Sequence, residues 1–223
     1  MFPPGYGKNV PMHVDHLVFA AGPDGLKAEV ERLGELLGAG FKDGGFHPRF
    51  GTRNHILPLA NDRYLEVVEV LEHPAADKAV FGQAVRARTE MGGGWLGWVL
   101  SVDDLAPFEQ RLQRTSVEGS RHFPDGRLLE WQQIGIQGLL ADPQLPYFLK
   151  WVSDESVRPS ALTGDIVVEE IDIAGSKPRV EDWLGTQIGD TFDGVRLTFE
   201  SPNGMPGIDG ITFNTPDKGV VRI

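Results

Sequence analysis

The stretch Val14-Asp15-His16-Leu17-Val18-Phe19-Ala20-Ala21 places one histidine in an otherwise mainly apolar run. An apolar run of this length, bounded by a turn signal at Gly22-Pro23, predicts a buried strand. Asp24 is a plausible N-cap, and apolar residues at helical spacing from Leu26 to Leu37 predict a helix. A single buried histidine is most often a core residue satisfied by its neighbours, so His16 gains interest only if this strand–helix unit returns.

The first unit continues as further strands. Thr52–Leu59 and Tyr64–Val70 alternate like strands, and Asn61-Asp62 between them predicts a hairpin turn. The turn-rich segment from Phe41 to Pro48 could hold one more short strand. Residues 12–71 are therefore predicted to form a βαβββ module.

The same order then restarts. A possible helix around residues 78–89 leads to a strand at 95–102, which is followed by a helix capped by Asp103 or Asp104. After a loop through Gly119 and Pro124, strands are predicted at 127–136 and 147–152. Residues 95–155 thus repeat the βαβββ order. The βαβββ order begins a third time in residues 160–223, which are predicted to form a partial or diverged copy of the module. Its predicted elements are a short helix near Trp183 and strands at 166–173, 195–200 and 210–214.

Composition narrows the function. The chain has 223 residues, no cysteine and a formal net charge of -11. Disulfides and thiolate metal sites are excluded, and the acidic balance argues against nucleic acid as a partner. No apolar run approaches the roughly 20 residues of a membrane helix, and residues 1–11 resemble a loose arm rather than a signal peptide. We expect a soluble, acidic, cytoplasmic α/β or α+β protein.

Paired βαβββ modules with a histidine in the first strand resemble the vicinal oxygen chelate superfamily, which includes glyoxalase I, extradiol dioxygenases and bleomycin-resistance proteins. The strings closest to its glyoxalase-like domain branch are Val14–Val18, Gly51–His55, Tyr64–Val68 and Tyr147–Trp151. The resemblance covers residues 12–155. It implies that the two modules form one cupped sheet around a cavity, with a homodimer as a possible assembly.

The resemblance also implies metal-ligand positions on the first and last strands of each module. These fall on His16, Glu66, Gly97 and Lys150. His16 and Glu66 keep ligand chemistry, whereas glycine has no side chain and a protonated lysine repels a divalent ion. A divalent metal is therefore possible but doubtful, unless another side chain such as His55 completes the site. No nucleotide cofactor is indicated, because Gly92-Gly93-Gly94 lacks the context of a phosphate loop.

Two residues are candidate catalytic groups. Glu66 is either an exposed glutamate on a half-buried strand or a cavity carboxylate that serves as metal ligand or general base. Lys150 either extends to solvent or points inward, where it would pair with Glu66 or bind an anionic group. The candidate ligand-binding residues are polar or aromatic side chains on predicted strands: Arg53, Asn54, His55, Trp98, Trp131 and Gln132.

The strand register decides which residues near Glu66 share its face. A two-residue turn at Asn61-Asp62 would place His55 there, and one residue of slip would place Asn54 there instead. The leading expectation is a glyoxalase-like enzyme with isomerase, lyase or dioxygenase chemistry on an oxygenated substrate. The main alternative is a metal-free protein that sequesters a small molecule. A third is an interaction module whose C-terminal segment blocks or completes the cavity.

Overall fold

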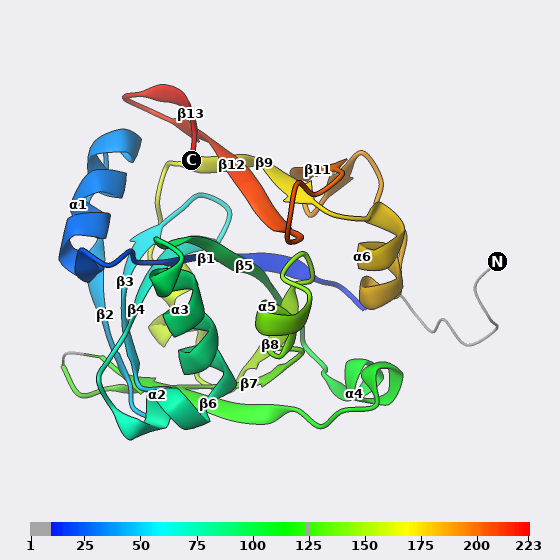
Figure 1. Cartoon of the computed structure of the whole chain (residues 1–223), viewed down its shortest axis with the longest axis horizontal. Helices are drawn as coiled ribbons and strands as arrows, with labels where there is room; N and C mark the ends of the chain where they lie inside the picture. Colours follow the sequence, from blue (N-terminus) through cyan, green and yellow to red (C-terminus); the bar gives the residue numbers. More distant parts are fainter. Residues whose placement is uncertain (1–9, 124) are drawn as a thin grey trace.

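The computed structural model describes residues 10–123 and 125–223, which form a closed β-barrel and a second, open sheet (Figure 1). The first half of the barrel consists of β1 (His13–Ala20), α1 (Gly25–Leu37), β2 (Lys42–His47), β3 (Thr52–Pro58) and β4 (Tyr64–Val70). α2 (Pro74–Lys78) and α3 (Val80–Glu90) form the connection to the second half.

The second half repeats the order. It consists of β5 (Gly94–Ser101), α4 (Ala106–Leu112), β6 (Val117–His122), β7 (Leu128–Ile134), α5 (Gly138–Ala141) and β8 (Tyr147–Trp151). Two 3-10 turns, η1 (Glu155–Val157) and η2 (Pro159–Ala161), lead to the last sheet. That sheet contains β9 (Val167–Ala174), β10 (Thr191–Phe192), β11 (Val195–Glu200), β12 (Gly207–Thr215) and β13 (Gly219–Arg222), with α6 (Lys177–Leu184) after β9.

The strand order confirms the predicted fold class. The barrel runs β1-β4-β3-β2-β6-β7-β8-β5, so each βαβββ module supplies four neighbouring strands. The modules meet at two seams. β1 and β5 pair along their lengths, whereas β2 and β6 are joined through the single pair Phe46–His122. The division of the chain into domains 12–155 and 160–223 stays a prediction. Its boundary falls between β8, the last strand of the barrel, and β9, the first strand of the second sheet.

One expected loop is a strand. Gly119 lies within β6, with Gly119 and Arg121 buried and most of the other side chains exposed or half-buried. Because the inward residues are a glycine and an arginine, β6 lacks the alternation of apolar residues that predicts strands. Pro124 lies outside the described residues, as do residues 1–9 of the predicted arm. Within the described chain, no helix is long and apolar enough to cross a membrane.

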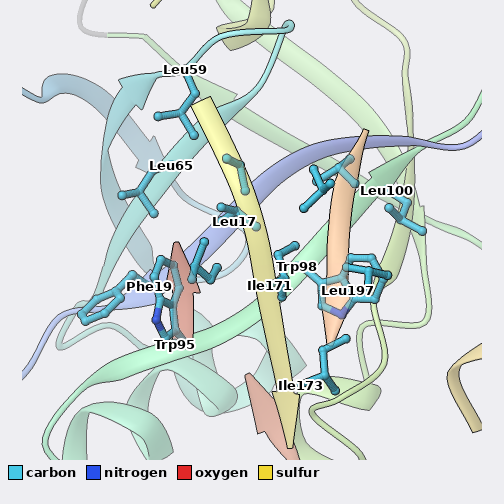
Figure 2. Packing of buried hydrophobic residues seen from close by; sticks show 14 of the residues in the cluster. Leu17, Phe19, Leu59, Leu65, Trp95, Trp98, Leu100, Ile171, Ile173 and Leu197 are labelled. Carbon is cyan, nitrogen blue, oxygen red and sulfur yellow. The ribbon is translucent and has the colours of Figure 1, made fainter. Parts of the chain in front are cut away.

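The C-terminal sheet covers the outer face of the barrel at β1 and β5 (Figure 1). Figure 2 shows Leu17 and Trp98 of the barrel beside Ile171 and Leu197 of this sheet, and Phe19 beside Trp95 in the same cluster. A second cluster includes Val18 and Val99 on the other side of these strands and Leu149 of β8. The outward faces of β1 and β5 are therefore core, and their inward faces surround the barrel interior.

Candidate functional site

A narrow cavity lies inside the barrel, and its volume is about 30 Å³, space for one or two water molecules. Its polar lining comes from seven strands: His16, His47, Asn54, Tyr64, Glu66, Arg121, Gln133 and Tyr147. An aromatic wall completes it: Phe50, Phe81, Trp131 and Trp151. Convergent polar groups in a mainly aromatic hollow are typical of a small-molecule site.

Glu66 lies at the centre of the polar groups. Its side chain comes from β4, and the residue is 5% exposed. Asn54 donates a hydrogen bond from Nδ2 to Oε1 of Glu66 at 2.5 Å. The other neighbours are two histidine nitrogens, Nε2 of His16 at 3.8 Å from Oε2 and Nε2 of His47 at 4.0 Å from Oε1. This carboxylate is thus buried, held by one donor and flanked by two imidazoles.

Both imidazoles are oriented through their Nδ1 atoms. Nδ1 of His16 lies 2.7 Å from Oδ1 of Asp15, and Oδ2 of Asp15 accepts a hydrogen bond from Trp151 Nε1 at 2.8 Å. Asp15 reaches its neighbour because β1 has an irregularity in register between Val14 and His16. Nδ1 of His47 lies 2.9 Å from the hydroxyl of Thr52. These contacts leave both Nε2 atoms directed toward Glu66.

Burial sets the protonation of the other groups in the cavity. It lowers the pKa of His47 to about 3, with smaller contributions from Arg121 and His16, so His47 is neutral near pH 7. Burial also raises the pKa of Tyr147 well above 10, with contributions from Glu66 and Asp15. The pKa of Tyr64 rises for the same main reason. Both phenols are therefore hydrogen-bond donors at neutral pH, and the Tyr147 hydroxyl lies 3.4 Å from His16 Nε2.

Arg121 is the unexpected member of the site. It is 2% exposed, yet its Nη1 and Nη2 atoms have no hydrogen-bond partner among the described residues. Its guanidinium carbon lies 4.6 Å from the centroid of the Phe123 ring. Burial lowers the pKa of Arg121, while Tyr64, Glu66 and Asp43 act in the opposite direction, and an arginine stays charged at neutral pH. An uncompensated buried cation costs several kcal/mol.

The structure brings only some of the predicted ligand-binding residues to the cavity. Asn54 and Trp131 line it, as does Glu66. Gln132 does not, because it alternates with Gln133 along β7 and Gln133 is the inward residue. Trp98 points the other way, into the core between the barrel and the C-terminal sheet, and donates from Nε1 to the Gln144 carbonyl.

The β3–β4 register excludes Arg53 and His55 from the Glu66 face. Ile56 pairs with Glu66 and Asn54 pairs with Val68, so Asn54 shares the Glu66 face. The turn explains this register, because Leu59 N donates to Arg63 O and leaves three residues, not two, in the connection. Arg53 forms an ion pair with Glu69 outside the barrel instead, with Nε 2.7 Å from Oε2.

The strand pairs of β1, β4, β5 and β8 place the predicted ligand positions. The parallel β1–β4 pair places His16 beside Tyr64, and the parallel β5–β8 pair places Val99 beside Tyr147. Across the β1–β5 seam, Val99 pairs with His16 and Gly97 pairs with Val18, so Gly97 and Val99 share one face of the sheet and neither has a donor side chain. Leu149 follows Tyr147 by two residues, as Glu66 follows Tyr64, and Leu149 rather than Lys150 lines the cavity.

Lys150 consequently lies outside the barrel. Its neighbours in sequence, Leu149 and Trp151, line the cavity, while Lys150 lines a separate surface hollow with Arg158 and Asp193. The expected inward pairing of Lys150 with Glu66 is wrong, because residues alternate faces along a strand and the inward positions of β8 are odd-numbered.

These positions decide how well the chain fits the metal site of the superfamily. Gly97, Val99 and Leu149 supply no donor side chain and Lys150 lies outside the barrel, so these positions of the second module contribute no ligand. The remaining donors are His16, His47 and Glu66, and the cation Arg121 lines the same cavity. In the described chain, no cluster of three or more His, Asp or Glu side chains is arranged to hold a metal ion. The residues therefore do not fit a four-ligand site.

His47, Arg121 and Asp15 were not predicted. His47 ends a glycine-rich strand, and Arg121 occupies a strand of mainly polar residues, so neither has an apolar neighbour pattern that marks burial. Asp15 should face away from His16 by alternation, and only the irregularity in β1 allows their contact. The repeated Tyr-x-Glu and Tyr-x-Leu strings were the available signal for Tyr64 and Tyr147.

Comparisons with known proteins agree with this architecture. A family model described as a glyoxalase-like domain matches residues 14–189. The chain is similar to the crystal structure of a hypothetical protein from Staphylococcus aureus, with a TM-score of 0.69 and 15% identity over 95% of this chain and 98% of that one. Methylmalonyl-CoA epimerase from Mycobacterium tuberculosis matches with a TM-score of 0.40 and 14% identity, over 62% and 86% of the two chains. No curated protein matches.

Proposed function

Because this chain belongs to the glyoxalase-like domain family of the vicinal oxygen chelate superfamily, we propose that it is an isomerase- or lyase-type enzyme acting on a small carbonyl compound. Its reaction begins with removal of a proton from the carbon next to the carbonyl group. The observation that supports this most is the position of Glu66, a buried carboxylate facing the barrel cavity. Such a group is suited to act as a general base.

The neighbouring side chains support the same chemistry. Glu66 accepts the proton, and the electron pair of the broken C–H bond moves into the carbonyl group, which becomes an enolate oxygen. Tyr147 is protonated and lines the cavity, so it can donate a hydrogen bond to this oxygen. His16 is oriented by Asp15 and lies beside both Tyr147 and Glu66. Return of the proton to the same carbon regenerates the substrate and gives exchange with solvent. In a substrate with a hydroxyl group next to the carbonyl, transfer of the hydroxyl proton to the enolate oxygen and return of the carbon-bound proton from Glu66 to the other carbon complete an isomerisation.

We derive no step through a metal, since the donor set does not fit the four-ligand site of the superfamily. Metal content is measurable independently by elemental analysis of untagged protein after loading with a divalent ion and gel filtration. The proposal predicts well below one ion per chain. About one tightly held ion per chain, lost in a His16→Ala variant, would contradict it.

Proton exchange with solvent tests the proposal. Pyruvate, 2-oxobutyrate and hydroxyacetone are incubated with the protein in D2O, and the loss of each C–H signal next to the carbonyl is followed by proton NMR. We expect catalysed exchange for at least one compound and a fall of about 10²- to 10⁴-fold in its rate for Glu66→Gln. Glu69→Gln is the matched control, because Glu69 lies on β4 outside the cavity.

Two results would contradict this assignment. One is exchange no faster than in buffer for all three compounds, and the other is equal exchange by wild type and Glu66→Gln. The lack of a ligand side chain at the two family positions of the second module, Gly97 and Lys150, favours a second candidate, a protein that binds a small molecule without turnover. In the same NMR experiment, that candidate predicts saturable line broadening of a compound without loss of its C–H signal.

A further inference from the structure

The cavity contains polar atoms that the chain itself leaves without partners. They are Nη1 and Nη2 of Arg121, Nε2 of Gln133 and Oδ1 of Asn54, all buried and without a hydrogen bond within the described chain. Buried polar groups are nearly always paired, so several unpaired groups on one cavity indicate a missing partner. Three of these four atoms are nitrogen donors, and two belong to a cation.

The charges around Arg121 do not replace that partner. Glu66 and Asp43 are close enough to influence it, yet no ion pair among the described residues includes Arg121. Glu66 instead accepts from Asn54, and an Asp43 carboxylate oxygen accepts from the Gly45 amide. Neither carboxylate lies within ion-pair distance of the guanidinium.

We propose that the cavity binds a compact carboxylate-bearing substrate, whose carboxylate accepts two hydrogen bonds from Nη1 and Nη2 of Arg121 and one from Nε2 of Gln133. The planar guanidinium matches the two oxygens of a carboxylate, which a point charge does not. Arg121 and Gln133 come from neighbouring strands, β6 and β7, whereas Glu66 comes from β4 in the other module. The carboxylate therefore binds in one module while its reactive carbon lies beside the base of the other.

The size of the cavity restricts this substrate further. With space for one or two water molecules, it favours a compound of a few heavy atoms over an extended one. Combined with proton removal next to a carbonyl, the chemistry indicates a short oxo carboxylic acid. This substrate class rests on the proposed function, but binding of the carboxylate does not require that catalysis occur.

Calorimetric titration of the full chain with pyruvate tests the proposal, with pyruvamide as the uncharged analogue and inorganic phosphate as the competing anion. We expect pyruvate to bind more tightly than the other two compounds. Arg121→Met should lower its affinity at least about tenfold, since a bidentate charged contact is lost. Arg121→Lys should recover only part of it. Arg127→Met, at an exposed arginine near the same strands, is the control.

The melting temperature gives an independent readout if a variant binds pyruvate poorly because it is misfolded. Because Arg121 is an unpaired buried cation, Arg121→Met should raise the melting temperature of the ligand-free protein and remove the gain that pyruvate gives to wild type. Gln133→Leu should reduce the same gain.

Several outcomes would overturn the proposal: pyruvate affinity equal in wild type and Arg121→Met, equal affinity for pyruvamide, or tighter binding of phosphate. Failure of the proposed function has a different signature. Pyruvate binding that depends on Arg121, without catalysed proton exchange, would support the carboxylate site and contradict the proposed enzymatic function. Catalysed proton exchange of hydroxyacetone, but not of pyruvate or 2-oxobutyrate, would support the proposed enzymatic function and contradict the carboxylate site.

Discussion

At the scale of single residues, the site is a small set of buried polar groups whose protonation follows from their surroundings. His47 is the clearest case, since burial and the nearby Arg121 and His16 lower its pKa to about 3. A neutral imidazole there keeps Nε2 available to Glu66 without adding a second cation beside Arg121. The cost of this arrangement appears in the dependence of stability on pH.

Below pH 6.5 the unfolded chain protonates His47 whereas the folded chain does not, so protons stabilise the unfolded state. The free energy of unfolding should therefore fall as pH decreases, by about 1.4 kcal/mol per pH unit from this residue between pH 6 and 4. His47→Gln should reduce this slope by about that amount. Urea unfolding at a series of pH values measures it, with the exposed His122→Gln as control. An unchanged slope in His47→Gln would show that His47 titrates normally in the folded protein.

The residues also show how far prediction from sequence extends. His16 and Glu66 were identified because each interrupts an apolar strand, where a polar side chain is conspicuous. Arg121 has no such contrast, since β6 is mainly polar and an arginine there resembles a surface residue. Lys150 was conspicuous in the same way as Glu66 but lies on the opposite face, because composition marks a strand without fixing its inward side.

At the scale of elements, the barrel is asymmetric in its two seams. β1 and β5 pair through seven residue pairs, whereas β2 and β6 meet at Phe46–His122 alone. The weak seam lies between His47 at the end of β2 and Arg121 in β6, both of which line the cavity. The β2–β6 seam is therefore the wall of the cavity with the fewest strand pairs.

Gly45→Ala tests the role of this seam. Gly45 has a φ of 97°, which disfavours alanine, and an added Cβ would collide with the carbonyl oxygen of His122. We expect faster amide hydrogen exchange in β2 and β6, a lower melting temperature and weaker pyruvate binding. Gly40→Ala, where an added Cβ meets nothing within 4 Å, is the control. Normal exchange protection in both strands would contradict the structural role of the seam.

The elements themselves were predicted better than their pairing. β1, α1, β3, β4, β5, β8 and β9 lie close to their predicted positions, because each has apolar periodicity bounded by turn residues. The register between β3 and β4 depended on one residue of turn length. That residue decided between His55 and Asn54 as the neighbour of Glu66, and local propensity does not resolve such a difference.

At the scale of the whole molecule, the C-terminal sheet is part of the barrel's core rather than an appendage. Phe213 of β12 is fully buried and its ring lies 6.3 Å from that of Trp95 in β5. The outward face of β1 and β5 is apolar, so without this sheet it would be exposed to water. This apolar layer holds the strands that carry His16 in place. The expected homodimer and cytoplasmic location stay predictions.

This packing predicts one cooperative unfolding transition. Phe213→Ala should destabilise the whole protein by about 3–5 kcal/mol, through lost burial and a cavity. Val220→Ala, at a valine that is 66% exposed, should have little effect. Urea unfolding followed by both tryptophan fluorescence and circular dichroism measures this. A separate early transition in Phe213→Ala, with the main transition unchanged, would show that the sheet folds independently.

The central claim is that Glu66 and Arg121 face one substrate inside the barrel. A crystal structure of Glu66→Gln with pyruvate tests it most directly, because this variant should bind the compound without exchanging its protons. We expect the carboxylate on Arg121 and Gln133, with the methyl carbon next to residue 66. Pyruvate bound instead in the surface hollow beside Lys150 and Arg158, with the barrel cavity unchanged, would contradict the claim.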